Sequence, residues 1–214
     1  MENELIYERR FGARNQFEIA VPFAWREQSG AGGDDDWQEG VGDIKLGLKR
    51  VLYHDLAQGT IFSVSGEVSL PSGDTDEGFG ADSAIFEPSL LYGQLLPRGF
   101  FLHGQLGLGI PTDGDRTNDE AFLRFAAGRS IVPGRWGRVW TPMVELVGAK
   151  ELVSGADAHW DLVPQFQVTL SQRQHVRLNA GLQVPVDDGG TDRDTALRVY
   201  LLWDWFDGGL LEGW

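Results

Sequence analysis

The chain has 214 residues, no Cys, 29 Gly and a formal net charge of −14. The absence of Cys excludes disulfides, thiolate metal sites, covalent haem attachment and a Cys nucleophile. A hydrophobic content of 42% excludes a disordered acidic tail, and the acidic balance excludes nucleic acid as a partner because no basic stripe is available for phosphate.

Period-2 alternation of apolar and polar residues recurs along the chain in about eleven stretches, each closed by Gly, Pro, Asp or Asn. This spacing predicts β-strands, and no segment of comparable length keeps a helical period. We therefore predict one all-β domain over residues 1–214. In chain order the clear stretches are 16–26, 43–49, 62–70, 100–110, 159–170, 176–184 and 197–205, with weaker ones near 5–11, 84–95, 121–128 and 139–149.

The connections between these stretches alternate strictly between short and long. Because each hairpin reverses the chain, the long connections are expected at one end of the sheet. They hold 18 of the 32 acidic residues and only three basic ones, which predicts an acidic rim. The short connections are 12–15, 54–59, 96–99, 130–135 and 171–174, and the long ones are 28–40, 71–82, 111–120, 150–157 and 186–194.

The face that points inward decides the class of barrel. A soluble barrel buries its apolar face, whereas a transmembrane barrel turns an apolar band toward lipid and keeps a polar lumen. Four or five bulky apolar residues on each strand would overfill a closed barrel, while the Gly, Ala, Ser and Gln of the other face suit a lumen. We therefore predict an antiparallel up-and-down transmembrane β-barrel. A soluble barrel or a two-sheet sandwich is the alternative.

Three runs carry a resemblance to a known family. They are Glu-Ile-Ala-Val-Pro at 18–22, Gly-Val-Gly-Asp-Ile-Lys-Leu-Gly-Leu-Lys at 40–49 and Val-Ser-Leu-Pro-Ser-Gly at 68–73. They resemble a family of bacterial outer-membrane β-barrels described as transporters, the "MetA-pathway of phenol degradation" type. The resemblance implies a location in the outer membrane and passive transport. Members carry a signal peptide and a strand before the segment that matches 3–11, so we expect about 12 strands, 11 of them visible and the first upstream of Met1.

The candidate lumen residues are those on the polar face of each strand, the positions that alternate with the apolar ones. Acids and bases nearly balance among them, so no strong ion selectivity is expected, and a polar lumen argues against an apolar solute. The alternative is that these groups pair with one another across strands and fill the lumen, so that the barrel is closed to solutes. The candidates are Glu18, Arg26, Asp43, Lys45, Lys49, Glu67, Glu87, His103, Arg124, Glu145, His159, Asp161, Arg177 and Arg198.

No arrangement of residues indicates catalysis, a metal or a cofactor. Of the four His residues, His103, His159 and His175 lie on the polar face and have no Ser or Asp placed beside them by local spacing. The acidic loops lack the full spacing of a calcium loop. The sequence thus predicts a non-enzymatic outer-membrane channel or transporter for a small solute. Its partners would be membrane lipid, lipopolysaccharide and that solute. A structural barrel that binds another envelope protein is the second interpretation, and a soluble lipid-binding barrel is the third.

Overall fold

The computed structural model describes residues 2–29, 35–75, 78–115, 117–132, 138–171, 175–187 and 193–204. Within these ranges, no helix is long and apolar enough to cross a membrane. The strands are β1 (Glu2–Phe11), β2 (Asn15–Ser29), β3 (Asp35–Val41), β4 (Lys45–Asp55), β5 (Thr60–Ser69), β6 (Ile85–Leu95), β7 (Phe100–Pro111), β8 (Glu120–Arg129), β9 (Trp140–Glu151), β10 (His159–Thr169), β11 (Val176–Pro185) and β12 (Ala196–Trp203).

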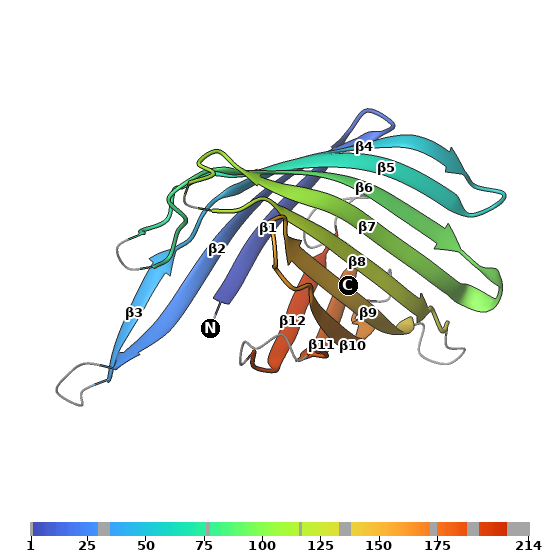
Figure 1. Cartoon of the computed structure of the whole chain (residues 1–214). Coiled ribbons are helices and arrows are strands. Elements are labelled where there is room, and N and C mark those ends of the chain that lie inside the picture. The colour runs from blue at the N-terminus through green and yellow to red at the C-terminus, as the bar shows by residue number, and fades with distance from the viewer. Residues whose placement is uncertain are drawn as a thin grey trace.

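All strands belong to one antiparallel sheet in which neighbours in sequence pair, except that β4 pairs with β2 and β3 pairs with β2 alone. Figure 1 shows this sheet strongly curved and twisted, with the β2–β3 hairpin projecting at its left side. The predicted all-β, up-and-down architecture is therefore confirmed. A single-turn helix, η1 (Pro97–Gly99), makes the β6–β7 turn.

The third position of the sheet is divided between two strands. The first part of β2 pairs with β4, and its second part pairs with β3 from Phe23↔Val41 to Ser29↔Asp35. The expectation of a long loop over 28–40 is therefore wrong, because most of this segment is hairpin. Its Gly and Asp residues carry a loop signal, but backbone pairing with β2 needs no such side-chain pattern.

The path of strands has two open ends over the residues that the structure describes. There, β1 pairs with β2 alone and β12 pairs with β11 alone. Because β3 and β4 share one position, the path has eleven positions. All pairs are antiparallel, so the first and last strands run in the same direction. Direct closure would require a parallel pair, which is unlike every other pair in the sheet.

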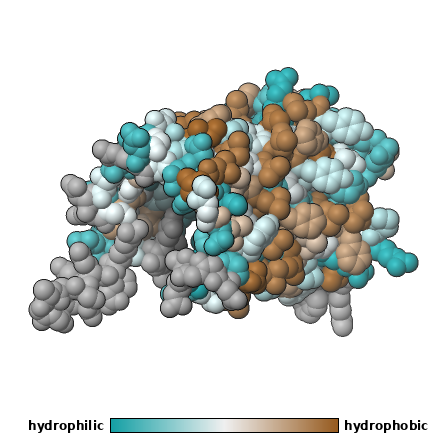
Figure 2. Space-filling view, in the orientation of Figure 1, coloured by the Kyte–Doolittle hydropathy of each residue, from teal (hydrophilic) through white to brown (hydrophobic). Residues whose placement is uncertain are grey.

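The two faces of the sheet differ as the sequence predicts. Leu48, Leu106 and Leu201 on the convex face are each more than half exposed, whereas Ser63 and Ser89 on the concave face are buried. Figure 2 shows the apolar side chains gathered over the strands that face the viewer, with hydrophilic residues around them. Large exposed apolar residues beside small buried polar ones reverse the pattern of a water-soluble sheet.

The concave face is less uniformly polar than expected. Phe101 and Phe122 belong to it and are only 8% and 7% exposed. A Cβ atom on Gly107 would lie 2.3 Å from Cζ of Phe122, so the Phe122 ring occupies that space. The ring of Phe101 lies over Gly128 in the same way. These rings fit on the otherwise polar face because the glycines opposite them in the neighbouring strands have no side chains.

Candidate functional site

Most of the candidate residues gather in four places on or beside the concave face. The first, the mouth cavity, lies at the end of the sheet that carries the long connections. The second, the acidic row, crosses β1 to β6. The third, the lumen cavity, lies between β5 and β12. The fourth, the rim network, joins the start of β10 to the β11–β12 connection.

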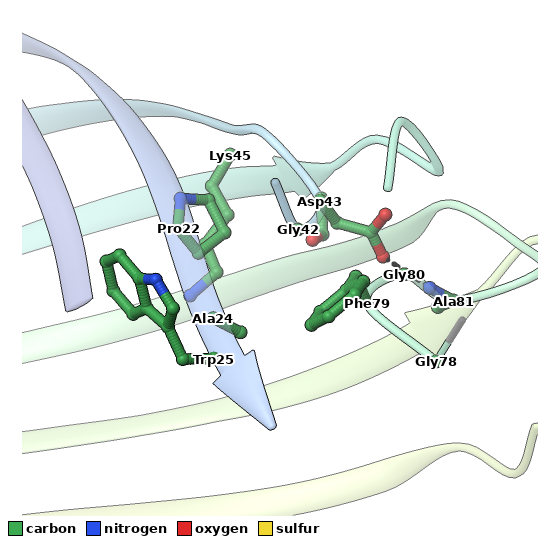
Figure 3. Close-up of a pocket in the computed structure, with 11 residues that line it drawn as sticks. Pro22, Ala24, Trp25, Gly42, Asp43, Lys45, Gly78, Phe79, Gly80 and Ala81 are labelled. Carbon is green, nitrogen blue, oxygen red and sulfur yellow. Dashed lines mark hydrogen bonds between the residues drawn. The ribbon is translucent and has the colours of Figure 1, made fainter. Parts of the chain in front are cut away.

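Asp43 organises the mouth cavity by holding the β5–β6 connection. Its Oδ1 atom accepts hydrogen bonds from the backbone N–H groups of Ser72 (3.1 Å) and Gly73 (3.0 Å), and its Oδ2 atom accepts one from Ala81 (2.7 Å). Figure 3 shows the Asp43–Ala81 contact beside Phe79. Hydrogen bonds to an ionised acceptor are among the stronger ones in proteins. The carboxylate thus anchors Ser72, Gly73 and Ala81 in the β5–β6 connection.

Phe79 fills the space that this anchor creates. It is buried, and its ring occupies the position that a Cβ on Gly40 would take, 2.3 Å from its Cδ2 atom. The backbone N–H of Gly42 donates to the carbonyl of Pro22 at 2.9 Å, which closes the corner. The cavity left there measures about 520 Å³ and is lined among others by Pro22, Ala24, Trp25, Gly42, Asp43, Lys45, Phe79 and Gly80. The three runs that carry the family resemblance therefore meet in one corner.

The acidic row follows the cross-strand register. Glu8 is the partner of Glu18, Gly47 is the partner of both Glu18 and Glu67, and Glu67 is the partner of Glu87. Four carboxyl groups thus share one level of five adjacent strands. This brings together Glu18, Glu67 and Glu87 from the predicted set, and it adds Glu8, which the weak pattern of β1 hid.

Two lysines flank Gly47 on the same face of β4. Lys45 lies opposite Ala20 and reaches across β2 to Glu4, with 3.0 Å between Nζ and Oε1. Lys49 lies between Gln16 and Ser65 in the register. Ala20, the register partner of Lys45, is 2% exposed.

The lumen cavity measures about 460 Å³ and brings His103, Arg124 and Glu145 together. Glu145 accepts a hydrogen bond of 2.9 Å from the side-chain amide of Gln165. Arg124 lies with its guanidinium carbon 5.3 Å from the centre of the Phe122 ring. Sequence reasoning missed Gln165, although it has the same parity as Asp161.

Tyr200 closes one side of the lumen cavity. Its hydroxyl donates to Oε1 of Gln167 at 3.1 Å, so the side chain reaches from β12 to β10 across β11. Asn179 is the register partner of both residues and lies beneath this bridge, 1% exposed. The sequence pattern places Tyr200 on the polar face of β12, but its contact with Gln167 depends on the register of three strands, which no local pattern contains.

The rim network holds two further predicted residues away from the lumen cavity. Arg193 donates to Asp161 Oδ1 at 2.8 Å and also pairs with Asp187. His159 Nδ1 lies 3.5 Å from Asp187 Oδ1, too long for a good hydrogen bond. The network ties the β11–β12 connection to the start of β10.

The remaining candidates lie apart from these groups. Arg198 donates from Nε to Gln183 at 2.9 Å near the open edge of the sheet. Arg177 lies opposite Thr169 and Leu202 in the register. Arg26 lies outside the residues whose side chains the structure describes.

No set of three or more His, Asp or Glu residues in the described ranges is arranged to hold a metal ion. Comparison with known families matches residues 3–141, well over half of the chain, to the family described as "Putative MetA-pathway of phenol degradation". No curated protein matches the chain.

Proposed function

The chain belongs to the family described as "Putative MetA-pathway of phenol degradation", and from this membership and its two-faced sheet we propose that it is an outer-membrane β-barrel. Its activity would be that of a channel or transporter for a small solute. The proposal gives the chain no catalytic role. Its surroundings would be membrane lipid and lipopolysaccharide.

The observation that carries this proposal is the reversed distribution of side chains. Large apolar residues such as Leu48 and Leu106 are exposed on the convex face, while charged residues such as Arg124 and Glu145 line a cavity on the concave face. In water, a broad exposed apolar surface favours aggregation. In a bilayer the same surface is solvated by lipid, and the concave face becomes a polar lumen.

Membrane insertion requires that the open edges of β1 and β12 be covered. Each unpaired backbone N–H or C=O group in hydrocarbon raises the free energy by roughly several kcal/mol. Membrane-spanning sheets are therefore closed. We therefore propose that the functional form is a closed barrel in which both edges are paired.

The family description names phenol degradation, but the charges in the lumen support a more polar solute for this chain. Arg124, Glu145 and the acidic row all lie on the concave face. An aromatic alcohol would gain little from charges of both signs. We therefore propose transport of a small polar solute.

Reconstitution into liposomes tests the proposal. The folded chain should partition with outer membranes, and proteoliposomes should swell in iso-osmotic arabinose faster than empty liposomes. Protein that remains soluble without detergent would contradict the membrane location. Folded protein that inserts but gives no swelling would contradict transport.

That last result would favour the second candidate, a structural barrel that surrounds another envelope protein. The observation in its favour is that some concave-face groups are already paired, as Lys45 is with Glu4. A lumen filled by such pairs would conduct nothing, and co-purification of a second envelope protein would then be expected.

A further inference from the structure

The lumen cavity has the size and the lining of a binding site for a small molecule. Its volume of about 460 Å³ lies within the usual range for ligand pockets. Its lining combines small side chains, such as those of Ser63 and Ala126, with larger ones. The cavity thus has room for a molecule and charged groups to orient it.

Arg124 is the main cation of this cavity, and its guanidinium forms no ion pair with the described residues. Glu145 lies on the neighbouring strand, where Glu145 pairs with Ala126, two residues from Arg124. Among the described residues, no carboxylate lies within ion-pair distance of Arg124, and its described contact is with the ring of Phe122. A guanidinium has five N–H donors in a fork that matches a carboxylate.

Glu145 supplies the second polar contact. Gln165 occupies one of its oxygen atoms, Oε2, and no other hydrogen bond to Glu145 occurs in the described part of the chain. Its Oε1 atom is therefore available to accept from a donor on a ligand. A donor beside a carboxylate is the arrangement found in hydroxy acids and amino acids.

We propose that the lumen cavity binds small organic carboxylates, with Arg124 holding the carboxylate and Glu145 accepting from a neighbouring hydroxyl or amino group. This rests on the proposed function, because it names the class of solute that would cross the barrel. The carboxyl group of Glu145 disfavours a doubly charged phosphate, since the extra negative charge would lie beside it. A monocarboxylate with a neighbouring hydroxyl or amino group has one partner for each of its groups, Arg124 for the carboxylate and Glu145 for the donor.

Transport of matched solutes tests the proposal. Proteoliposomes with the full chain are assayed for uptake of L-lactate and of lactamide, which has the same shape without the charge, and arabinose serves as the general pore probe. Wild-type protein should take up lactate faster than lactamide. Arg124→Gln should lower this ratio about tenfold, because it removes a charge-assisted pair. Arabinose uptake is measured for each variant, so that a general change in pore flux is separated from the change in the ratio.

Arg129→Gln is the matched control. Arg129 lies on the same strand but outside the cavity, with its guanidinium carbon 5.1 Å from the centre of the Phe100 ring. It should keep the wild-type ratio. Arg124→Lys should give an intermediate ratio, because it keeps the charge and loses the fork. An equal fall in both Gln variants would indicate an effect that does not depend on the cavity and would overturn the assignment to Arg124.

Calorimetric titration of lactate into the detergent-solubilised protein separates this inference from the proposed function. If the protein takes up arabinose but Arg124→Gln does not change the ratio of lactate to lactamide uptake, the carboxylate site is overturned and transport stands. Lactate binding that depends on Arg124, in protein that passes no arabinose, would overturn transport and keep the site. Absence of both would overturn both.

Discussion

The Oδ2 atom of Asp43 accepts a hydrogen bond of 2.7 Å from the backbone N–H of Ala81, a residue 38 positions further along the chain. This contact fastens the β5–β6 connection to the corner between β3 and β4. Phe79, two residues before Ala81, packs against Gly40 as a result. A single carboxylate therefore sets the shape of the mouth of the sheet.

Replacing Asp43 with Ala should release this connection. Three backbone N–H groups would lose their acceptor. Those that remain out of contact with water should lower the free energy of unfolding by roughly 1–3 kcal/mol. We expect faster amide hydrogen exchange at Ser72, Gly73 and Ala81, measured by NMR or mass spectrometry. Asp82→Asn, a change of charge in the same connection, is the control. Unchanged exchange at all three amides in Asp43→Ala would contradict the anchor role.

Adding a methyl group at Gly107 should strain the concave face. The Cβ would lie 2.3 Å from Cζ of Phe122, and the buried ring has little room to move. Gly107→Ala should therefore lower the free energy of unfolding by about 1–3 kcal/mol. Gly114→Ala is the control, because its Cβ would meet nothing within 4 Å. Equal stabilities of the two variants in urea unfolding would show that the ring is not confined.

An arginine on the convex face should cost more than one on the concave face. Leu106 is 55% exposed on the convex face, and its neighbour Gln105 lines the lumen cavity. In a bilayer, Leu106→Arg should lower stability by about 2–4 kcal/mol, whereas Gln105→Arg should cost much less. Unfolding of the two variants from liposomes measures the difference. A larger cost for Gln105→Arg would mean that the polar face contacts the apolar phase.

The two open edges should not pair directly with each other. Direct pairing would be parallel, so we expect one further antiparallel strand between β1 and β12 in the closed barrel. In the variant with Tyr7→Cys and Val199→Cys, oxidation should give no intramolecular disulfide. Ala180→Cys with Val199→Cys is the positive control, because these residues are register partners. Efficient crosslinking of the Tyr7 variant would show that β1 and β12 close the sheet themselves.

The long connections should face the outside of the cell. Since the chain has no Cys, single cysteines report on one position each. Thr75→Cys in the β5–β6 connection should react with a membrane-impermeant maleimide on intact cells. Gln58→Cys, in the short β4–β5 turn, should react only after the outer membrane is permeabilised. The opposite labelling pattern would reverse the orientation.

The sequence by itself determined the strands other than β3, and their two faces. Alternation with period 2 is a local property, so each of these strands and its apolar side could be assigned without knowing its neighbours. The alternation of short and long connections then placed the strand ends. Residues such as Leu106 and Ser63 lie on the faces that this pattern assigned to them.

The tertiary structure alone decided which polar side chains meet. Glu8, Glu18, Glu67 and Glu87 share a level because of register, and register depends on pairing between strands. Asp43 had the parity of a lumen acid, but its three hydrogen bonds come from a connection about 30 to 38 residues away. The bridge from Tyr200 to Gln167 likewise depends on curvature. Periodicity records the side of a strand, whereas contacts between distant residues depend on register, curvature and loop path, which no local pattern contains.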